Sequence, residues 1–245
     1  MSTILLKFAG PLQSWGTGSH FEDRHTDYYP SKSAVIGMLA ACLGYHRNED
    51  EKLKQLQQLD FALRIDQQGS LLKDYQIATK YTDNGKFERN YVTNRYYLSV
   101  AVFVVAISHQ QDNFIQELAT ALRQPWFQPF MGRRSAVMNT DYFLAVTKET
   151  VLESLQNYPW QAAMWWQKKS HDTKVSLEIY ADAHLLPSLP SHLRRDQALS
   201  FSFKGRKFAY RLEAKSMVKI INQHAKKVAV EHDIWQSIGA EHVSN

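Results

Sequence analysis

Three segments of this 245-residue chain carry side chains that are suited to binding single-stranded nucleic acid. The first is Gln13-Ser14-Trp15-Gly16, which follows a short apolar run at the N-terminus. An indole ring can stack on an unpaired base and an amide can hydrogen-bond to its edge, so Gln13 and Trp15 are candidates for base recognition. Alternatively, Trp15 covers the edge of the hydrophobic core, and the residue types alone leave both interpretations open.

The second segment is FMGRRS at residues 130–135, which lies in an irregular stretch after a predicted helix. Gly132 lets the backbone approach a ligand closely, and the adjacent side chains of Arg133 and Arg134 project in different directions. Both guanidinium groups are therefore candidates for binding phosphate. The alternative is a solvated turn without a ligand.

The third segment, residues 73–95, alternates polar and apolar residues around Asn84-Gly85, which predicts a β-hairpin. Its charged residues are Lys73, Lys80, Lys86, Arg89 and Arg95 on the basic side and Asp74, Asp83 and Glu88 on the acidic side. A polar hairpin of this length has too little apolar surface to be a core element. We therefore expect either a loose excursion or a hairpin that is ordered by a partner.

The charge distribution also favours a polyanionic partner. The chain has a formal net charge of +5 and a pI of about 9.1. Between Arg194 and Lys227 there are ten Lys or Arg residues but only two acidic residues, interleaved with Phe201, Phe203, Phe208 and Tyr210. Such a pattern is typical of nucleic-acid binders, although a solvated strand face would look similar.

Signatures of enzymes and of cofactor sites are absent from the sequence. There is no nucleophile elbow, zinc-protease helix, Walker loop or dinucleotide-binding turn, so we expect neither a catalytic site nor a cofactor. The single cysteine, Cys42, cannot form an internal disulfide or a cysteine-based zinc site, and we expect no metal. His20 and His25 lie in the first loop and are the candidates for acid–base catalysis in a metal-free ribonuclease, the alternative function.

The hydrophobic patterning predicts an α+β fold with a body of residues 1–150. Without the hairpin, the order of elements is βαββαβ, which is the ferredoxin-like arrangement that RNA-recognition motifs also use. Ser31 and Gly44 are suited to begin and end the first helix. The expected strands span residues 2–8, 61–65, 97–107 and 142–146, and the expected helices span 31–43, 50–59 and 112–123.

The remaining residues, 151–245, are expected to form a small C-terminal β-rich subdomain. A helix at 148–157 leads into it, followed by an aromatic stretch at 160–166, a strand at 174–180 and a linker at 186–190. Two further strands around residues 204–207 predict a second, basic hairpin. Lys226, Lys227 and Trp235 are assigned to an additional terminal helix. No apolar run is long enough to cross a membrane and no signal peptide is recognised, so we expect a soluble cytoplasmic protein.

Four segments, in this order, resemble a known family. They are LLKFAGPLQSWG at residues 5–16, PSKSAVIGMLAACLG at 30–44, TNRYYLSVAVF at 93–103 and FMGRRS at 130–135. Together they resemble the CasD subunits of type I-E CRISPR Cascade complexes, which belong to the RAMP superfamily, and the resemblance runs from about residue 4 to about residue 215.

The resemblance implies an RRM-like body with a protruding β-hairpin thumb at about residues 73–95. It also implies a non-catalytic subunit that holds the 5′ handle of the CRISPR RNA and caps the Cascade backbone. The implied partners are the CRISPR RNA, the backbone subunit and the large subunit, with target DNA involved only indirectly. In a related Cascade type the corresponding subunit is the endoribonuclease that processes precursor CRISPR RNA without a metal, but no local pattern of that enzyme transfers to this chain.

The resemblance also implies a set of RNA-binding residues. Those that match its motifs are Gln13, Trp15, Ser31, Lys32, Arg95, Arg133 and Arg134. Lys80, Lys86 and Arg89 lie in the expected thumb and match by location only.

Overall fold

A computed structural model describes residues 1–18 and 23–225 of the chain. The strands are β1 (Ser2–Ala9), β2 (Leu12–Gln13), β3 (Asp23–Arg24), β4 (Asp60–Gln67), β5 (Ser70–Tyr81), β6 (Phe87–Ser99), β7 (Val102–His109), β8 (Phe143–Thr147), β9 (Lys174–Asp182), β10 (Ser191–Ser200) and β11 (Lys207–Ile221). The helices are α1 (Lys32–Cys42), α2 (Asp50–Gln57), α3 (Asp112–Arg123), α4 (Val151–Asn157), α5 (Met164–Lys169) and the 3-10 turn η1 (Ala183–Leu185).

Most strands join a seven-stranded sheet in the order β10-β11-β9-β4-β7-β1-β8, in which all neighbours are antiparallel. Successive side chains of a strand point to opposite faces of the sheet. In β1, Leu6 and Phe8 accordingly belong to the main hydrophobic core, whereas Leu5 belongs to a second cluster on the other face. Both faces of the centre of the sheet are buried, which explains the nearly continuous apolar runs of β1 and β7.

The helices divide between the two faces. Residues of α1, α2 and α3 pack in the main core, and Val151 and Leu155 of α4 pack in the second cluster. The predicted ends of the first helix are confirmed, because the Ser31 hydroxyl accepts a hydrogen bond from the Ala34 amide at 3.3 Å and Gly44 follows the helix with φ at +75°. Among the helices of the described residues, none combines the length and the apolar character needed to cross a bilayer.

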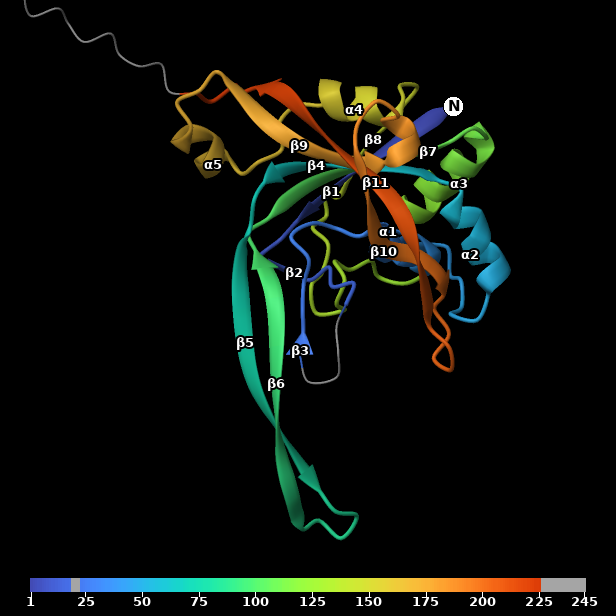
Figure 1. The fold of residues 1–245 in the computed structure, drawn as a ribbon, viewed down its shortest axis with the longest axis vertical. Coiled ribbons are helices and arrows are strands. Elements are labelled where there is room, and N and C mark those ends of the chain that lie inside the picture. Colours follow the sequence, from blue (N-terminus) through green and yellow to red (C-terminus); the bar gives the residue numbers. More distant parts are fainter. Residues whose placement is uncertain (19–22, 226–245) are drawn as a thin grey trace, which may run out of the picture.

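The predicted hairpin is confirmed. β5 and β6 project from the body as a long two-stranded ribbon, which we call the thumb (Figure 1). The thumb belongs to a second sheet of four strands, β2, β3, β5 and β6, and it is joined to the main sheet because β4 leads into β5 and β6 leads into β7. Gly85 takes a positive φ of +74° in the turn at its tip, as the Asn-Gly pair predicts.

The prediction of one strand over 97–107 is wrong, because the ribbon bends between β6 and β7. Val100 adopts a left-handed conformation with φ at +52°, which interrupts the ladder. The side-chain amide of Gln67 donates a hydrogen bond to the Val100 carbonyl at 2.5 Å, and the Val100 amide donates to the Pro11 carbonyl at 3.2 Å. The bend is therefore fixed from both sides by polar contacts.

The C-terminal strands extend the same sheet as the body, since β9 pairs with β4. The predicted strand at 174–180 and the predicted hairpin around residues 204–207 are both confirmed. The helix expected at 148–157 begins only at Val151, because Thr150 and Glu153 cap it reciprocally. The aromatic stretch contains the short helix α5. The expected terminal helix with Lys226, Lys227 and Trp235 lies outside the described residues.

Candidate nucleic-acid interface

The N-terminal segment, residues 13–16, and the GRRS turn, residues 132–135, meet at the base of the thumb. β5 pairs with β6 along one edge, and β2 and β3 pair with the other edge of β6 near its C-terminal end. The Ser14 amide donates a hydrogen bond to the Met131 carbonyl at 3.2 Å, which joins the N-terminal segment to the GRRS turn. The fold thus brings together segments that are more than 80 residues apart in the sequence.

Gly132 allows the GRRS turn to pack closely against the N-terminal segment. Its φ is +80°, and a Cβ atom added at this position would lie 1.6 Å from the carbonyl oxygen of Ser14. Glycine is the residue that adopts this conformation without strain and leaves room for such a close approach. The GRRS turn is consequently packed directly on the segment that contains Gln13 and Trp15.

Arg133 attaches the turn to the thumb. Its guanidinium lies over the Tyr97 ring, 4.3 Å from the centroid, and Nη2 donates a hydrogen bond to the Arg24 carbonyl at 2.9 Å. Nη1 is screened from solvent and has no hydrogen-bond partner among the described residues. Arg134 is exposed on the same turn.

Four arginines gather around this point. Arg24 and Arg95 are register partners in the parallel pair β3–β6, so their side chains lie on the same face, and both are exposed. With Arg133 and Arg134 they form what we call the thumb-base surface. None of the four arginines forms an ion pair within residues 1–18 and 23–225, although Asp74 on β5 is the register partner of Arg95. A surface with this charge can bind phosphate, and the buried Tyr97 ring beneath Arg133 supports it.

Arg24 was not identified from the sequence. It lies in a strand of two residues inside a stretch that has the composition of a loop, so only its pairing with β6 reveals its position. On the opposite face of the thumb base, the His25 ring stacks on Tyr96 with 5.1 Å between centroids. The Lys73 ammonium lies 5.9 Å from the centroid of the same Tyr96 ring.

The register of the thumb separates two faces of different chemistry. On β6, the residues Arg89, Tyr91, Thr93, Arg95 and Tyr97 share one face with Lys80, which is opposite Arg89. We call this the charged face. The Arg89 guanidinium lies 4.3 Å from the centroid of the Tyr91 ring, so this face presents a cation over an aromatic ring.

The other face of the thumb carries mostly neutral side chains. Tyr75 and Ile77 lie here opposite Asn94 and Val92, and we call it the neutral face. The predicted residues of the thumb tip are solvent-exposed: Lys80 forms an ion pair with Glu88 at 2.8 Å, and Lys86 lies beside the turn.

Gln13 and Trp15 lie inside the protein, which corrects the expectation that they contact a base. Their exposed fractions are 0% and 2%. The Gln13 amide donates to the Ala101 carbonyl at 2.8 Å and accepts from the Trp15 indole at 3.0 Å, and the indole stacks on Phe8. Every polar group of the pair is used within the chain, so both side chains support the thumb base from below.

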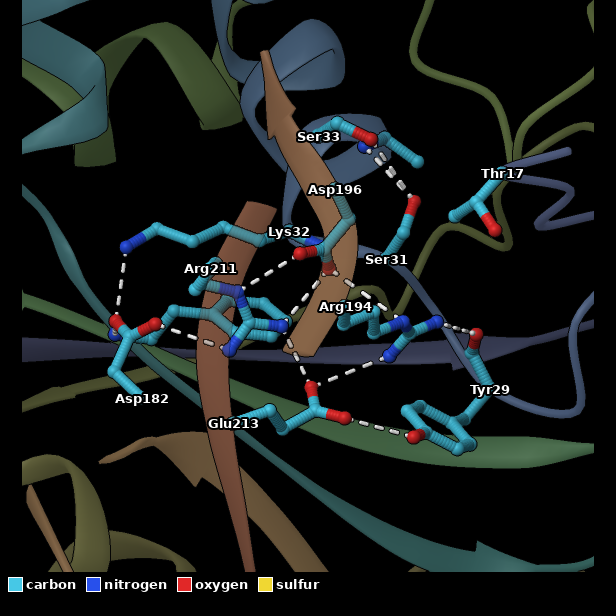
Figure 2. Close-up of polar contacts among 12 residues, drawn as sticks. Thr17, Tyr29, Ser31, Lys32, Ser33, Asp182, Arg194, Asp196, Arg211 and Glu213 are labelled. Atoms are coloured by element: carbon cyan, nitrogen blue, oxygen red, sulfur yellow. Dashed lines mark hydrogen bonds and ion pairs between the residues drawn. The ribbon is translucent and has the colours of Figure 1, made fainter. Parts of the chain in front are cut away.

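Ser31 and Lys32 are also buried, which corrects their assignment to RNA. Ser31 caps α1, and the Lys32 ammonium donates to Asp182 at 2.9 Å and to the Leu59 carbonyl at 2.7 Å. Figure 2 shows the Lys32 side chain extending toward Asp182, and both residues are buried. The match to the family motif at these positions therefore marks the packing of α1.

Lys32 belongs to a buried polar network that joins α1, β9, β10 and β11 (Figure 2). Arg211 is at its centre and contacts Asp182 at 3.1 Å, Asp196 at 2.8 Å and Glu213 at 2.6 Å. Arg194 joins Glu213 to the first loop. Burial acts to lower the pKa of Arg194, but the carboxylates of Glu213 and Asp196 outweigh it and raise this pKa, so the guanidinium stays charged.

Metal binding and acid–base catalysis both need titratable side chains that converge on one point. Within the part of the chain that the structure describes, no group of three His, Cys, Asp or Glu side chains is arranged to hold a metal ion. Of the two histidines considered for acid–base catalysis, His25 stacks on Tyr96 and His20 lies outside the described residues.

Comparisons with known proteins agree with this architecture. A family model described as CRISPR-associated protein (Cas_Cas5) matches residues 3–212. The chain is 30% identical over 172 residues to the CRISPR system Cascade subunit CasD of Escherichia coli (strain K12), a match that covers 64% of this chain and 77% of that protein.

Two solved structures are similar over most of their length. One is a chain of a CRISPR RNA-guided surveillance complex, with a TM-score of 0.73, 28% identity and coverage of 89% of this chain and 91% of that chain. The other is described as a crystal structure of a Cas protein, with a TM-score of 0.66, 30% identity and coverage of 91% and 97%. The chain belongs to the CRISPR-associated Cas5 family.

Proposed function

We propose that the protein is a non-catalytic, RNA-binding subunit of a type I-E Cascade complex that holds the 5′ handle of the CRISPR RNA. The single observation that carries this proposal is the thumb-base surface, where Arg24, Arg95, Arg133 and Arg134 form no ion pair within the described residues. Membership of the Cas5 family and the likeness to a chain of a CRISPR RNA-guided surveillance complex support it.

The chemistry of the thumb suits a single-stranded RNA. Arginines bind phosphates through two parallel N–H donors, and tyrosine rings stack on bases of any sequence. The charged face carries both kinds of side chain, with Arg89 and Tyr91 toward the tip and Arg95 near the base. We therefore propose that the handle crosses the thumb base and that the charged face borders it.

The fold supports a ferredoxin-like body. The central strands have the order β4-β7-β1-β8, with α1 on the connection from β1 to β4 and α3 on the connection from β7 to β8. We propose a division near residue 150, with the thumb-bearing body before it and the β9–β11 strands in a C-terminal part that adds to the edge of the body's sheet.

The proposed partners are the backbone subunit, which this chain would cap, and the large subunit, with target DNA involved indirectly. The name of the E. coli relative, a Cascade subunit, supports assembly with other protein chains. We place this assembly in the cytoplasm, where CRISPR RNA is made.

Titration of purified protein with RNA of the cognate handle sequence tests the proposal. Arg24→Ala combined with Arg95→Ala should weaken binding at least ten-fold, because the variant can no longer neutralise two phosphates. Lys52→Ala combined with Lys54→Ala is the matched control, since it removes two exposed charges on α2, far from the thumb (Figure 1). Equal affinities for both double variants would reject the thumb-base surface as the RNA site.

The non-catalytic assignment has its own test. Incubation with repeat RNA, with and without EDTA, should leave the RNA intact. Specific cleavage that persists in EDTA and disappears in His20→Ala or His25→Ala would move the assignment to the metal-independent endoribonuclease.

A further inference from the structure

The loop between β10 and β11 presents an exposed aromatic ring beside an arginine of another segment. Phe203 is 85% exposed, and the guanidinium of Arg47 lies 4.5 Å from the centroid of its ring. Arg47 comes from the loop after α1, so the contact joins two parts of the chain that are far apart in the sequence. Arg206 lies on the same β10–β11 loop as Phe203 and is also exposed.

The segment that leads into the GRRS turn is attached to the end of α1, a few residues before Arg47. The amides of Trp126 and Phe127 donate hydrogen bonds to the carbonyls of Cys42 and Ala41 at 2.9 and 3.2 Å, which fixes this segment to the end of α1. Burial lowers the pKa of Arg47, and the positive charges of Arg206 and Arg134 lower it further. The guanidinium of Arg47 is therefore within electrostatic range of both Arg206 and Arg134.

No carboxylate of the described residues compensates these three charges. Arg47, Arg134 and Arg206 form no ion pair within the residues that the structure describes. Like charges held together on a folded surface repel one another, and a bound anion relieves that repulsion. We call this group, together with Phe203, the arm cluster.

The arm cluster is held on a rigid support. Phe201 at the end of β10 packs against the core, and its ring approaches α1 so closely that a Cβ atom added to Gly37 would lie 3.3 Å from it. The buried network of Arg194 and Arg211 fixes β10 and β11 to the N-terminus of α1 (Figure 2). A rigid support lowers the entropy cost of binding at the cluster.

We propose that Arg47, Arg134 and Arg206 form a second phosphate-binding site for single-stranded RNA, with Phe203 as a stacking platform for a base. The inference rests on the proposed RNA-binding function and extends it. Arg133 contacts Tyr97 at the thumb base, and the positive charge of the adjacent Arg134 also acts on Arg47, so one RNA strand can pass from the first site to the second across the GRRS turn.

The proposal is tested by titrating RNA of the handle sequence, and a scrambled RNA of equal length, at several salt concentrations. Arg47→Ala combined with Arg206→Ala should lower the slope of log K against log salt by about 0.7 for each phosphate that is no longer neutralised, for both RNAs. Phe203→Ala should weaken binding roughly ten-fold without changing the slope, because it removes stacking and no charge.

The matched control is Lys174→Ala combined with Lys219→Ala, which removes two exposed charges at the other end of β9 and β11. This variant should keep the parent slope. If the Arg47/Arg206 variant also keeps the slope while the Arg24/Arg95 variant does not, the second site is rejected and the proposed function stands. If the parent binds neither RNA, both proposals fail. If the Arg47/Arg206 variant binds both RNAs like the parent but loses affinity for duplex DNA in a parallel titration, the cluster is a DNA site and the RNA proposal is wrong.

Discussion

The guanidinium of Arg133 lies 4.3 Å from the centroid of the Tyr97 ring, which attaches the GRRS turn to the base of the thumb. Tyr97 is a residue of β6, and β6 continues through the bend into the centre of the main sheet. The arginine pair is therefore positioned by the same ribbon that forms the charged face of the thumb.

The two arginines of the turn should differ in what they do besides binding phosphate. Arg134→Ala should lower the salt slope of RNA binding by about 0.7 and leave stability unchanged, because its side chain is exposed. Arg133→Ala should lower the slope by a similar amount and also lower the melting temperature, because it removes the interactions with Tyr97 and Arg24. Salt-dependent titrations and thermal melts measure the two effects.

Arg133→Lys is the finer variant at this position. Lysine keeps the charge but not the planar fork, so we expect intermediate affinity with a nearly preserved salt slope. A slope unchanged in both alanine variants, or an affinity loss restricted to the cognate handle sequence, would contradict a role in binding phosphate.

The two faces of the thumb should contribute unequally to RNA binding. Arg89→Ala combined with Tyr91→Ala removes a cation and the ring beneath it from the charged face, and should weaken binding to single-stranded RNA by about ten-fold or more. Ile77→Ser combined with Val92→Ser changes a directly opposed pair on the neutral face, at a comparable distance from the thumb base. The RNA affinity of this double variant, measured by fluorescence anisotropy, should stay within about two-fold of that of the parent.

Circular dichroism of both variants is the control, because the thumb must remain a hairpin for the comparison to hold. If the neutral-face variant weakens RNA binding as much as the charged-face variant, the RNA contacts both faces and the separation of faces is wrong.

Local patterns in the sequence were sufficient for most of the fold. Ser31 and Gly44 mark the ends of α1, and Asn84-Gly85 marks the tip of the thumb, because caps and tight turns are determined by a few neighbouring residues. The bend at Val100 could not be predicted, because a valine with positive φ is disfavoured by its own side chain and is stabilised here by distant partners.

The candidate site was predictable only in part, because tertiary contacts between distant segments also decide which of its residues are exposed. Gln13, Trp15, Ser31 and Lys32 have side chains that can bind RNA, and whether they are buried depends on which strands pack against them. Lys32 is neutralised by Asp182, 150 residues away in the sequence. A motif marks the importance of such positions, but only the tertiary contacts separate packing from binding.

Gly132 should not tolerate alanine. The added Cβ atom would overlap the Ser14 carbonyl, and the φ of +80° is strained for any residue with a side chain. We expect Gly132→Ala to destabilise the protein by about 2 kcal/mol or more and to weaken RNA binding, because the GRRS turn can no longer pack on the N-terminal segment.

Gly18→Ala is the matched control for this substitution. A Cβ atom at Gly18 meets nothing within 4 Å, so this variant should melt like the parent and bind RNA normally. Urea denaturation and RNA titration of both variants are the measurements. Parent-like stability of Gly132→Ala would mean that the close approach of the turn to Ser14 does not occur in solution.

Cys42 should be unreactive in the folded protein. Its side chain is buried in the main core, and burial raises the pKa of its thiol to about 12. At about pH 8 only roughly one thiol in ten thousand is then ionised, and the thiolate is the reactive form. Ellman's reagent should therefore label the native protein only at the rate of unfolding, and should label it at once in concentrated guanidinium chloride. Rapid labelling of the native protein would contradict the burial of α1 against the sheet.

Arg211 should be a major determinant of stability. It is buried and contacts three carboxylates, those of Asp182, Asp196 and Glu213. Replacing Arg211 with methionine keeps much of the volume but leaves these buried negative charges without their central partner, so we expect a loss of about 3–5 kcal/mol in the free energy of unfolding. Equilibrium urea denaturation is the measurement.

Lys215→Met on the same strand is the matched control for Arg211→Met. Lys215 also forms an ion pair, with Glu178 at 2.5 Å, but both side chains are largely solvated, so its removal should cost less than about 1 kcal/mol. If Arg211→Met does not fold, Arg211→Lys keeps a positive charge and should give a folded protein of intermediate stability. Similar losses of stability for Arg211→Met and Lys215→Met would mean that the network is not buried in solution. In that case the network would not hold the β10–β11 hairpin rigidly against α1, and the arm cluster would have no fixed support.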